Sequence, residues 1–155
     1  MSFSLRLATK EDIPQLIELR IEFLKEVQVD APKDMMDVYR EHLGEYLLKH
    51  MKNETFLAWL AEDENKTIIA TSGLAIIEKP PQLWNLTGKE TYIMNMYTKP
   101  KWRNQGIGST LLEKLLEESK NRDIFQVYLY ATPIGRALYE KYGFVKSEHS
   151  MYLRF

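Results

Sequence analysis

Apolar and polar residues follow strand-like and helix-like spacings along most of the chain. Alternation over Phe3 to Leu7 predicts a first strand with one buried face. Thr9 and Asp12 have the spacing of a capping box, and the apolar residues from Ile13 to Val27 recur as on one face of a helix. A second helix is expected to begin near Asp34, with apolar residues facing inward at positions 36, 39, 43, 47 and 51.

The second half of the chain predicts further strands around one more long helix. Three apolar runs predict strands at approximately Thr55–Ala61, Thr67–Glu78 and Thr91–Thr98. The long helix follows and turns Ile107, Leu111, Leu112, Leu115 and Leu116 inward. After it we expect a strand at Phe125–Tyr130, a short helix that begins at Thr132, and a last strand around Met151–Phe155.

The most distinctive segment is the turn that joins a strand to the long helix, KPKWRNQGIGSTLL from Lys99 to Leu112. Gly106 and Gly108 have no Cβ, so the backbone can bend sharply and bring its N–H groups close to a ligand. Arg103 adds a forked, permanently charged donor, and Ser109 adds a hydroxyl in the first helical turn. These features predict a site for a pyrophosphate.

Two better-known phosphate motifs do not fit this turn. A nucleotide-triphosphate P-loop ends in Gly-Lys-Ser/Thr, which is absent here. The dinucleotide fingerprint needs a third glycine where this chain has Leu111, and Asp123 precedes the next strand instead of ending it. For an isolated Gly-x-Gly, a plain strand-to-helix connection remains an alternative.

A second motif follows at the expected distance. The segment ATPIGRALYEKYGF, Ala131 to Phe144, ends with Gly143 where a left-handed helix cap is wanted. Together, Arg103-Asn-Gln-Gly106-Ile-Gly108 and Leu138-Tyr-Glu-Lys-Tyr-Gly143-Phe144 resemble the two signatures of the GNAT superfamily of acyl-CoA-dependent N-acyltransferases. The motifs cover the C-terminal third directly, and the N-terminal part agrees in its order of elements.

The resemblance implies a fold and an activity. The fold is a single α/β (α+β) GNAT-like domain over residues 1–155, with a mixed, mostly antiparallel, six- to seven-stranded sheet flanked by helices on both faces. The activity is N-acetyltransferase: direct transfer of an acetyl group from acetyl-CoA, in a ternary complex, to a primary amine of a small molecule or peptide, without a metal. A non-catalytic acyl-CoA-binding sensor is the alternative, and a structural module with an empty turn is a third.

The resemblance also assigns binding residues. The pyrophosphate would contact the glycine turn, that is Arg103, Asn104, Gln105, Gly106, Ile107, Gly108 and Ser109. The pantetheine arm would pair with the backbone of Met96, Tyr97 and Thr98, where an N–H would also hold the developing oxyanion. The hydroxyl of Thr132, which stands where the family often has asparagine, would either reach the pantetheine or cap the helix.

Catalytic residues are expected at two places. Tyr139 aligns with the family tyrosine that meets the CoA sulfur, and its phenol would act as general acid toward the departing thiolate. The family often places a glutamate base on the strand before the glycine turn, where this chain has Met94-Asn95. Glu90, Glu22 and Glu26 are base candidates acting through water, and Tyr128 and Tyr130 are weaker ones. Packed aromatic rings and solvated charges are the alternative reading for all of these residues.

Charge and composition limit the partners. A formal net charge of -1 offers no general attraction for nucleic acid, and zero cysteines exclude disulfides, thiolate metal sites and a cysteine nucleophile. Glu18, Glu22 and Glu26 form an acidic ridge that suits a polyamine or basic peptide, or is simply the polar face of a helix. The chain shows no leader-like or membrane-spanning run, so we expect a cytoplasmic protein. Pairing of the last strand, around Met151–Phe155, would support a homodimer.

Overall fold

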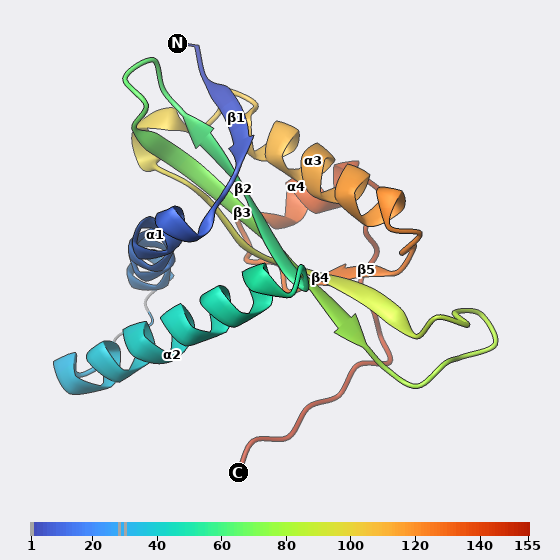
Figure 1. Ribbon diagram of the computed structural model, residues 1–155. Helices are drawn as coiled ribbons and strands as arrows, with labels where there is room; N and C mark the ends of the chain where they lie inside the picture. The colour runs from blue at the N-terminus through green and yellow to red at the C-terminus, as the bar shows by residue number, and fades with distance from the viewer. Residues whose placement is uncertain (1, 28, 30) are drawn as a thin grey trace.

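The computed structural model describes residues 2–27, 29 and 31–155. Five strands and four helices follow one another along the chain (Figure 1). In order they are β1 (Ser4–Leu7), α1 (Ile13–Glu26), α2 (Lys33–Lys52), β2 (Phe56–Glu62), β3 (Ile68–Glu78), β4 (Lys89–Thr98), α3 (Ile107–Asn121), β5 (Val127–Leu129) and α4 (Arg136–Lys141). Short 3-10 turns, η1 (Lys10–Asp12) and η2 (Pro100–Trp102), precede α1 and follow β4.

The strands form one sheet in the order β1-β2-β3-β4-β5. The first four are antiparallel to their neighbours, and β5 runs parallel to β4. The sheet is therefore mixed and mostly antiparallel, but the expected six to seven strands are wrong for the part of the chain that is described. The segment at Met151–Phe155, which was the expected last strand, pairs with no strand in the described residues and forms none.

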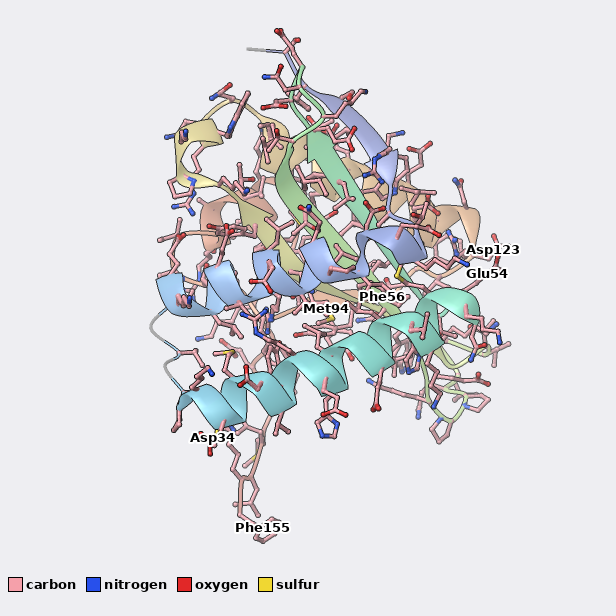
Figure 2. The ribbon with its side chains drawn as sticks, turned by 60° about the vertical axis from the view of Figure 1, so that its left-hand side comes forward. Asp34, Glu54, Phe56, Met94, Asp123 and Phe155 are labelled. Carbon is pink, nitrogen blue, oxygen red and sulfur yellow. The ribbon has the colours of Figure 1, made fainter. Side chains whose placement is uncertain are left out.

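Helices cover both faces of the sheet. On one face, α1 and α2 lie side by side across the strands (Figure 2), and Leu16, Leu19, Leu43 and Leu47 pack on Phe56 and its neighbours. On the other face, α3 supplies its apolar stripe to the sheet, and α4 joins it through Tyr139. None of the helices in the described residues is both long and apolar enough to cross a membrane.

A bulge in β4 changes which face its side chains reach. The register with β3 shifts between Thr71 and Gly73, opposite Asn95, whose φ of 56° is left-handed. Before the bulge, Met94 belongs to the α1/α2 face; after it, Met96 packs on the α3 side and Tyr97 returns to the α1/α2 side. The bulge therefore puts Met94 and Met96 on opposite faces of the sheet, whereas an unbroken strand would place both on the same face.

The sequence predicts the end of the short helix α4 correctly but not its start. Gly143, with φ of 87°, ends α4 in a Schellman arrangement, since the Phe144 N–H donates to Tyr139 O and the Gly143 N–H to Glu140 O. The sequence predicts Thr132 as N-cap and Pro133 as the first helical residue, but α4 begins at Arg136 with Gly135 as its N-cap. The intervening residues form a tight turn in which the N–H groups of Gly135 and Arg136 both donate to Thr132 O, which delays the first helical hydrogen bonds.

Candidate active site

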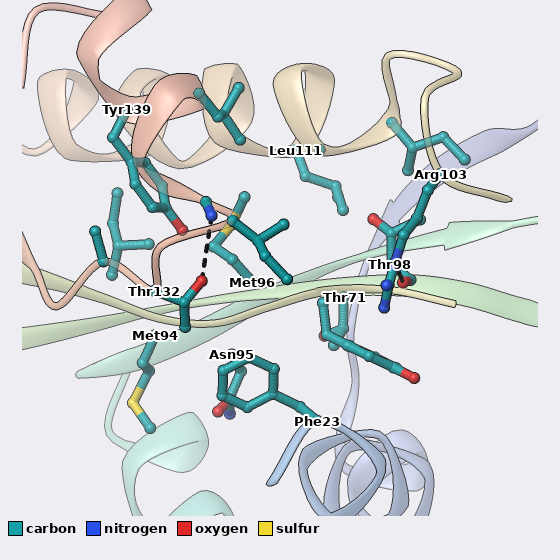
Figure 3. Close-up of a pocket in the computed structure, with 18 of the residues that line it drawn as sticks. Phe23, Thr71, Met94, Asn95, Met96, Thr98, Arg103, Leu111, Thr132 and Tyr139 are labelled. Carbon is teal, nitrogen blue, oxygen red and sulfur yellow. Dashed lines mark hydrogen bonds between the residues drawn. The ribbon is translucent and has the colours of Figure 1, made fainter. Parts of the chain in front are cut away.

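A cleft of about 620 Å³ lies where the glycine turn and the segment Ala131 to Phe144 meet the bulge of β4. Its walls come from α1, from residues 92–98 of β4, from the glycine turn and from α4 (Figure 3). The volume falls in the range of pockets that hold a cofactor or a drug-sized ligand. The cleft therefore brings together the glycine turn, Tyr139, Thr132 and the strand residues that the sequence placed in one site.

The glycine turn is shaped by backbone conformations that favour glycine. Gly106 is left-handed, with φ of 79°, and directly precedes the first residue of α3. The Gly106 carbonyl already accepts the Thr110 N–H, whereas the first N–H groups of the helix, at Ile107, Gly108 and Ser109, have no intrahelical partner. A Cβ built on Gly106 meets no atom within 4 Å, so the space before the helix is open. Such a helix start is suited to an anion.

Arg103 lies beside this turn, and its guanidinium is held from two sides. Its Nε donates to Thr98 O at 2.9 Å, and its Nη2 donates to Glu26 Oε2 at 2.6 Å. The Glu26 carboxylate raises the pKa of Arg103 further above its already high value. The remaining N–H groups of the fork are the ones that would face a phosphate. Glu26 is thus brought to the anion end of the cleft, as the partner of Arg103.

The other members of the turn have local roles. Asn104 is left-handed, with φ of 60°, which helps the chain to reverse before α3. The Gln105 amide donates weakly to Lys101 O at 3.4 Å. A Cβ on Gly108 would lie 3.6 Å from Leu138 of α4, an ordinary contact. The turn thus fixes its backbone by itself and needs few side chains to do so.

Tyr139 reaches the cleft from α4. Its ring packs edge-on to Phe144 at 5.8 Å, and only 8% of the residue is exposed. Figure 3 shows the ring directed from α4 toward Met96 on β4. Burial raises the pKa of Tyr139, because the phenolate would lose its hydration. The phenol is therefore protonated at neutral pH and can donate a hydrogen bond.

The turn before α4 supports this tyrosine. Thr132 Oγ1 accepts the Gly135 N–H at 3.2 Å and so closes this turn. The N-cap of α4 is Gly135, so the expected role of Thr132 as the cap of the helix is wrong. A Cβ on Gly135 would come within 3.2 Å of Tyr139 Cε2. Glycine at this position therefore leaves the aromatic ring the room that it occupies.

The edge of β4 is open at the cleft. Pairing with β5 covers only Thr91 to Ile93, and in the described residues it extends no further along β4. On its other edge β4 continues to pair with β3, up to Thr98 opposite Ala70. The backbone of Met96, Tyr97 and Thr98 therefore has one edge without a strand beside it. An extended chain of amides would fit along such an edge.

The three base candidates lie in different surroundings. Glu90 is buried and forms an ion pair with Lys79 at 2.5 Å, beside Tyr128. Glu22 lies near Tyr97, whose pKa is raised mainly by burial and further by the Glu22 and Glu26 charges. Because Glu18 pairs with Arg40 and Glu26 pairs with Arg103, the acidic ridge of α1 is partly neutralised within the chain.

The structure adds residues that the sequence did not single out. Arg20 and Tyr92 line the cleft, and Asn95 Oδ1 and Thr71 Oγ1 are buried at the bulge with no hydrogen-bond partner among the described residues. The sequence does contain a signal for Arg20. This charged residue stands four residues after Leu16 and three before Phe23, at a position where the helical spacing of α1 predicts an apolar side chain. The bulge at Asn95 has no comparable signal.

Comparison with known proteins gives a consistent result. The model of the "Acetyltransferase (GNAT) family" matches residues 15–144. A Clostridium acetobutylicum protein described as a predicted acetyltransferase, solved with acetyl-CoA, is 34% identical, and the match covers 99% of this chain and 96% of that one with a TM-score of 0.91. A GCN5-related N-acetyltransferase from Ralstonia eutropha JMP134 shares the fold at 24% identity, with 99% of both chains covered and a TM-score of 0.86.

A more distant relative carries a specific name. Glucosamine 6-phosphate N-acetyltransferase 1 of Oryza sativa subsp. japonica is 25% identical over 99 residues, which are 64% of this chain. The match spans 59% of the rice protein's length.

Proposed function

The chain belongs to the GNAT family of acetyltransferases, and we propose that it transfers an acetyl group from acetyl-CoA to a primary amine of a small molecule or peptide. The observation that carries this proposal is the joint presence, in one cleft, of an open helix N-terminus for an anion and a buried, protonated phenol. An anion site alone would suit many ligands. A proton donor at a fixed place in the same cleft is what a leaving thiolate needs.

The residues fit acetyl-CoA as the donor substrate. The N–H groups of Ile107, Gly108 and Ser109 would bind its diphosphate, with Arg103 beside them. The open edge of β4 at Met96 to Thr98 would pair with the amides of the pantetheine arm. When bound, acetyl-CoA supplies an activated acetyl thioester.

The chain's own groups would then act on three atoms. A backbone N–H on the open edge of β4 would bind the carbonyl oxygen as it gains charge, a contribution of about 3 kcal/mol when the donor is preorganised. Tyr139 would hold its proton toward the sulfur as CoA leaves. Attack requires a neutral amine, so a proton must also leave the amine nitrogen. Glu22 remains a base candidate through water, whereas Glu26 is engaged by Arg103, and Glu90 is engaged by Lys79 and lines a different groove. Holding amine and thioester together supplies much of the acceleration.

A thiol-release assay tests the proposal. Purified protein is incubated with acetyl-CoA and a panel of primary amines, namely polyamines, amino acids, amino sugars with and without phosphate, aminoglycosides and peptides with free N-termini. We expect at least one amine to raise thiol release well above the rate without amine, with a stoichiometric acetylated product in the mass spectrum. CoA alone should raise the melting temperature, because it binds only the folded state.

The alternatives give different results in the same experiment. A sensor would be stabilised by CoA, yet no amine would increase thiol release. A structural module would show no stabilisation by CoA at all. Either result would contradict the proposed activity.

A further inference from the structure

Arg20 is a cation placed on the face of α1 that otherwise packs on the sheet. Leu16, four residues earlier, is 3% exposed, and Phe23, three residues later, packs against the same core. A long charged side chain in such a stripe normally reaches water or an acidic partner. Arg20 instead lines the cleft that contains Tyr139 and Asn95.

The guanidinium of Arg20 has no carboxylate partner among the described residues. Its Nε donates to Tyr39 Oη of α2 at 3.3 Å, and its Cζ lies 5.2 Å from the centre of the Phe23 ring. No ion pair in the described part of the chain includes Arg20, although the neighbouring arginines Arg6, Arg40 and Arg103 are each paired with acidic residues. Its two terminal amino groups, four N–H donors, therefore lack an acceptor within the described chain.

The surroundings of Arg20 are aromatic. Tyr92, half-buried on β4, stacks on Tyr128 at 5.1 Å and meets Tyr130 edge-on at 5.9 Å. Tyr92 and Arg20 line the same cleft, and the Arg20 charge opposes the rise that burial causes in the pKa of Tyr92. A half-buried, hydrogen-bonded and unpaired guanidinium beside aromatic walls is a preformed binding group for an anion.

We propose that the acceptor is an amine that also carries an anionic group, a phosphate or a carboxylate, and that Arg20 binds this group while the amine faces the bulge of β4. This assignment rests on the proposed transferase activity and names its substrate class. The aliphatic or ring body of the acceptor would pack against Tyr92 and Tyr130, which line the same cleft. Phosphate and carboxylate both match the forked donor geometry of the guanidinium. Acceptors that carry one or the other anion show which of the two is bound.

Matched acceptor pairs test the proposal. The pairs are ethanolamine with O-phosphoethanolamine, glycinamide with glycine, and glucosamine with its 6-phosphate. We expect kcat/KM to be about tenfold or more higher for the anionic member of at least one pair, since hydrogen bonds to charged groups are strong. The phosphate pairs and the carboxylate pair then show which anion is preferred. Equal kcat/KM within every pair would overturn the proposal and leave the transferase activity intact.

Variants of Arg20 separate recognition from structure. Arg20→Gln should remove the preference for the anionic member by raising its KM, with kcat and the affinity for acetyl-CoA little changed. Arg20→Lys keeps the charge and should retain part of the preference. Arg40→Gln is the matched control, because Arg40 pairs with Glu18 outside the cleft and should not affect the preference. A merely structural Arg20 would lower the melting temperature and reduce kcat/KM equally for both members of a pair.

A binding measurement keeps the test independent of turnover. With the CoA site saturated, inorganic phosphate should raise the melting temperature of the wild-type protein and of Arg40→Gln, and should do so much less for Arg20→Gln. The same shift in Arg20→Gln as in the wild type would contradict an anion site at Arg20. If phosphate binds through Arg20 yet no amine is acetylated, the transferase proposal fails and the anion site stands.

Discussion

At the scale of single residues, Tyr139 is the best-supported chemical group in the cleft. A tyrosine on a short helix is usually a packing residue, and this one does pack, against Phe144 and the α3 side of the sheet. The same burial raises its pKa, so packing and the proposed proton donation would both follow from one environment. The two roles can be separated by removing the hydroxyl alone.

We expect Tyr139→Phe to lower kcat by about ten- to a hundredfold, because a positioned proton donor contributes at least that much. The affinity for acetyl-CoA and the melting temperature should stay near those of the wild type, since the ring is kept. Steady-state kinetics and calorimetric titration with CoA measure the two effects. Tyr142→Phe is the control, because Tyr142 directly follows the same helix, its hydroxyl donates to Glu113, and it does not line the cleft.

The pH dependence of kcat has a defined sign if Tyr139 is the donor. The phenol is active while protonated, so its contribution is complete below its pKa and is lost as the pH rises through it. Since burial raises the pKa above the ordinary value of about 10, the loss should begin in more alkaline solution than for a free tyrosine. A wild-type enzyme that keeps its full kcat at pH values where the phenol of Tyr139 has lost its proton would contradict the assigned role.

At the scale of elements, the strand-to-helix turn owes its shape to one of its two glycines. Gly106 is left-handed, whereas Gly108 lies within the first turn of α3 and has no positive φ. An added methyl at either position has room, since nothing lies within 4 Å of Cβ at Gly106 and only Leu138, at 3.6 Å, at Gly108. The two glycines therefore differ in conformation and not in packing.

This difference predicts opposite outcomes for two alanine variants. Gly106→Ala should lower the free energy of unfolding by about 1 kcal/mol and weaken acetyl-CoA binding, because the left-handed turn that aims the N–H groups is strained. Gly108→Ala should leave the stability equal or slightly higher, because alanine is the better helix former, and should keep CoA binding. Urea denaturation and calorimetric titration measure both. Equal effects of the two substitutions would contradict the conformational explanation.

A second element-scale feature joins β1, η1 and β2. Arg6 donates to both oxygens of Asp12, at 2.7 and 2.8 Å, and to Glu62 at 2.6 Å, while the Thr9 N–H donates to Asp12 as in a capping box. The bonds from Arg6 lower the pKa of Asp12 to about 2 from 3.8. Arg6 on β1 thus connects the edge strand to the start of α1 through Asp12 and to β2 through Glu62.

Acid should weaken this connection in a known pH window. The pKa of Asp12 is lower in the folded protein than in the unfolded chain. Its contribution to the free energy of unfolding is therefore complete above about pH 4 and is lost as the pH falls toward about 2. At neutral pH it amounts to at most about 2 kcal/mol, because Arg6 remains partly solvated. At pH 7, Asp12→Asn should have a free energy of unfolding lower than that of the wild type by up to this amount. The difference between the two proteins should shrink in acid. Asp37→Asn, at an exposed position on α2 that forms no ion pair in the described residues, is the control in urea denaturation.

These elements also show which features a sequence can predict. The capping box at Thr9 and Asp12, the helix end at Gly143 and the conformation of Gly106 depend on a few neighbouring residues, and all three are present. The partners of Glu26 and Glu90 come from residues distant in the sequence, Arg103 and Lys79. Likewise, the bulge at Asn95 arises from strand pairing. Such long-range pairings have no local pattern, so the electrostatic surroundings of the site could not be predicted.

At the scale of the whole molecule, the sheet is open at one side. The last strand in the order, β5, has three residues and pairs only with β4, so its outer edge is free in the described chain. Figure 1 shows the segment after α4 passing this region and leading away from the sheet. A groove of about 1440 Å³ lies between β5, α4 and the start of that segment. An unpaired edge beside a groove is a site for a further strand.

The C-terminal segment has the sequence of such a strand. Met151, Tyr152, Leu153 and Phe155 are between 76% and 116% exposed, which is an unusual density of large apolar side chains on a surface. Burial of each would contribute about 2 kcal/mol, against an ordering cost of about 1–2 kcal/mol per backbone residue. Two copies that exchange these segments would each gain the strand that their sheet lacks. We therefore expect a homodimer.

Removing the segment tests this expectation. Light scattering coupled to size exclusion should give a dimer mass for the full chain and a monomer mass for a chain that ends at Ser150. Leu153→Pro should also weaken association, because proline removes a backbone donor from the added strand, whereas Leu153→Ala should weaken it less. Leu48→Lys is the control, because it changes an exposed apolar residue that lies on α2 and not on β5 or the C-terminal segment. A full chain that stays monomeric, with the same stability as the shortened one, would mean that the apolar segment serves no pairing between copies.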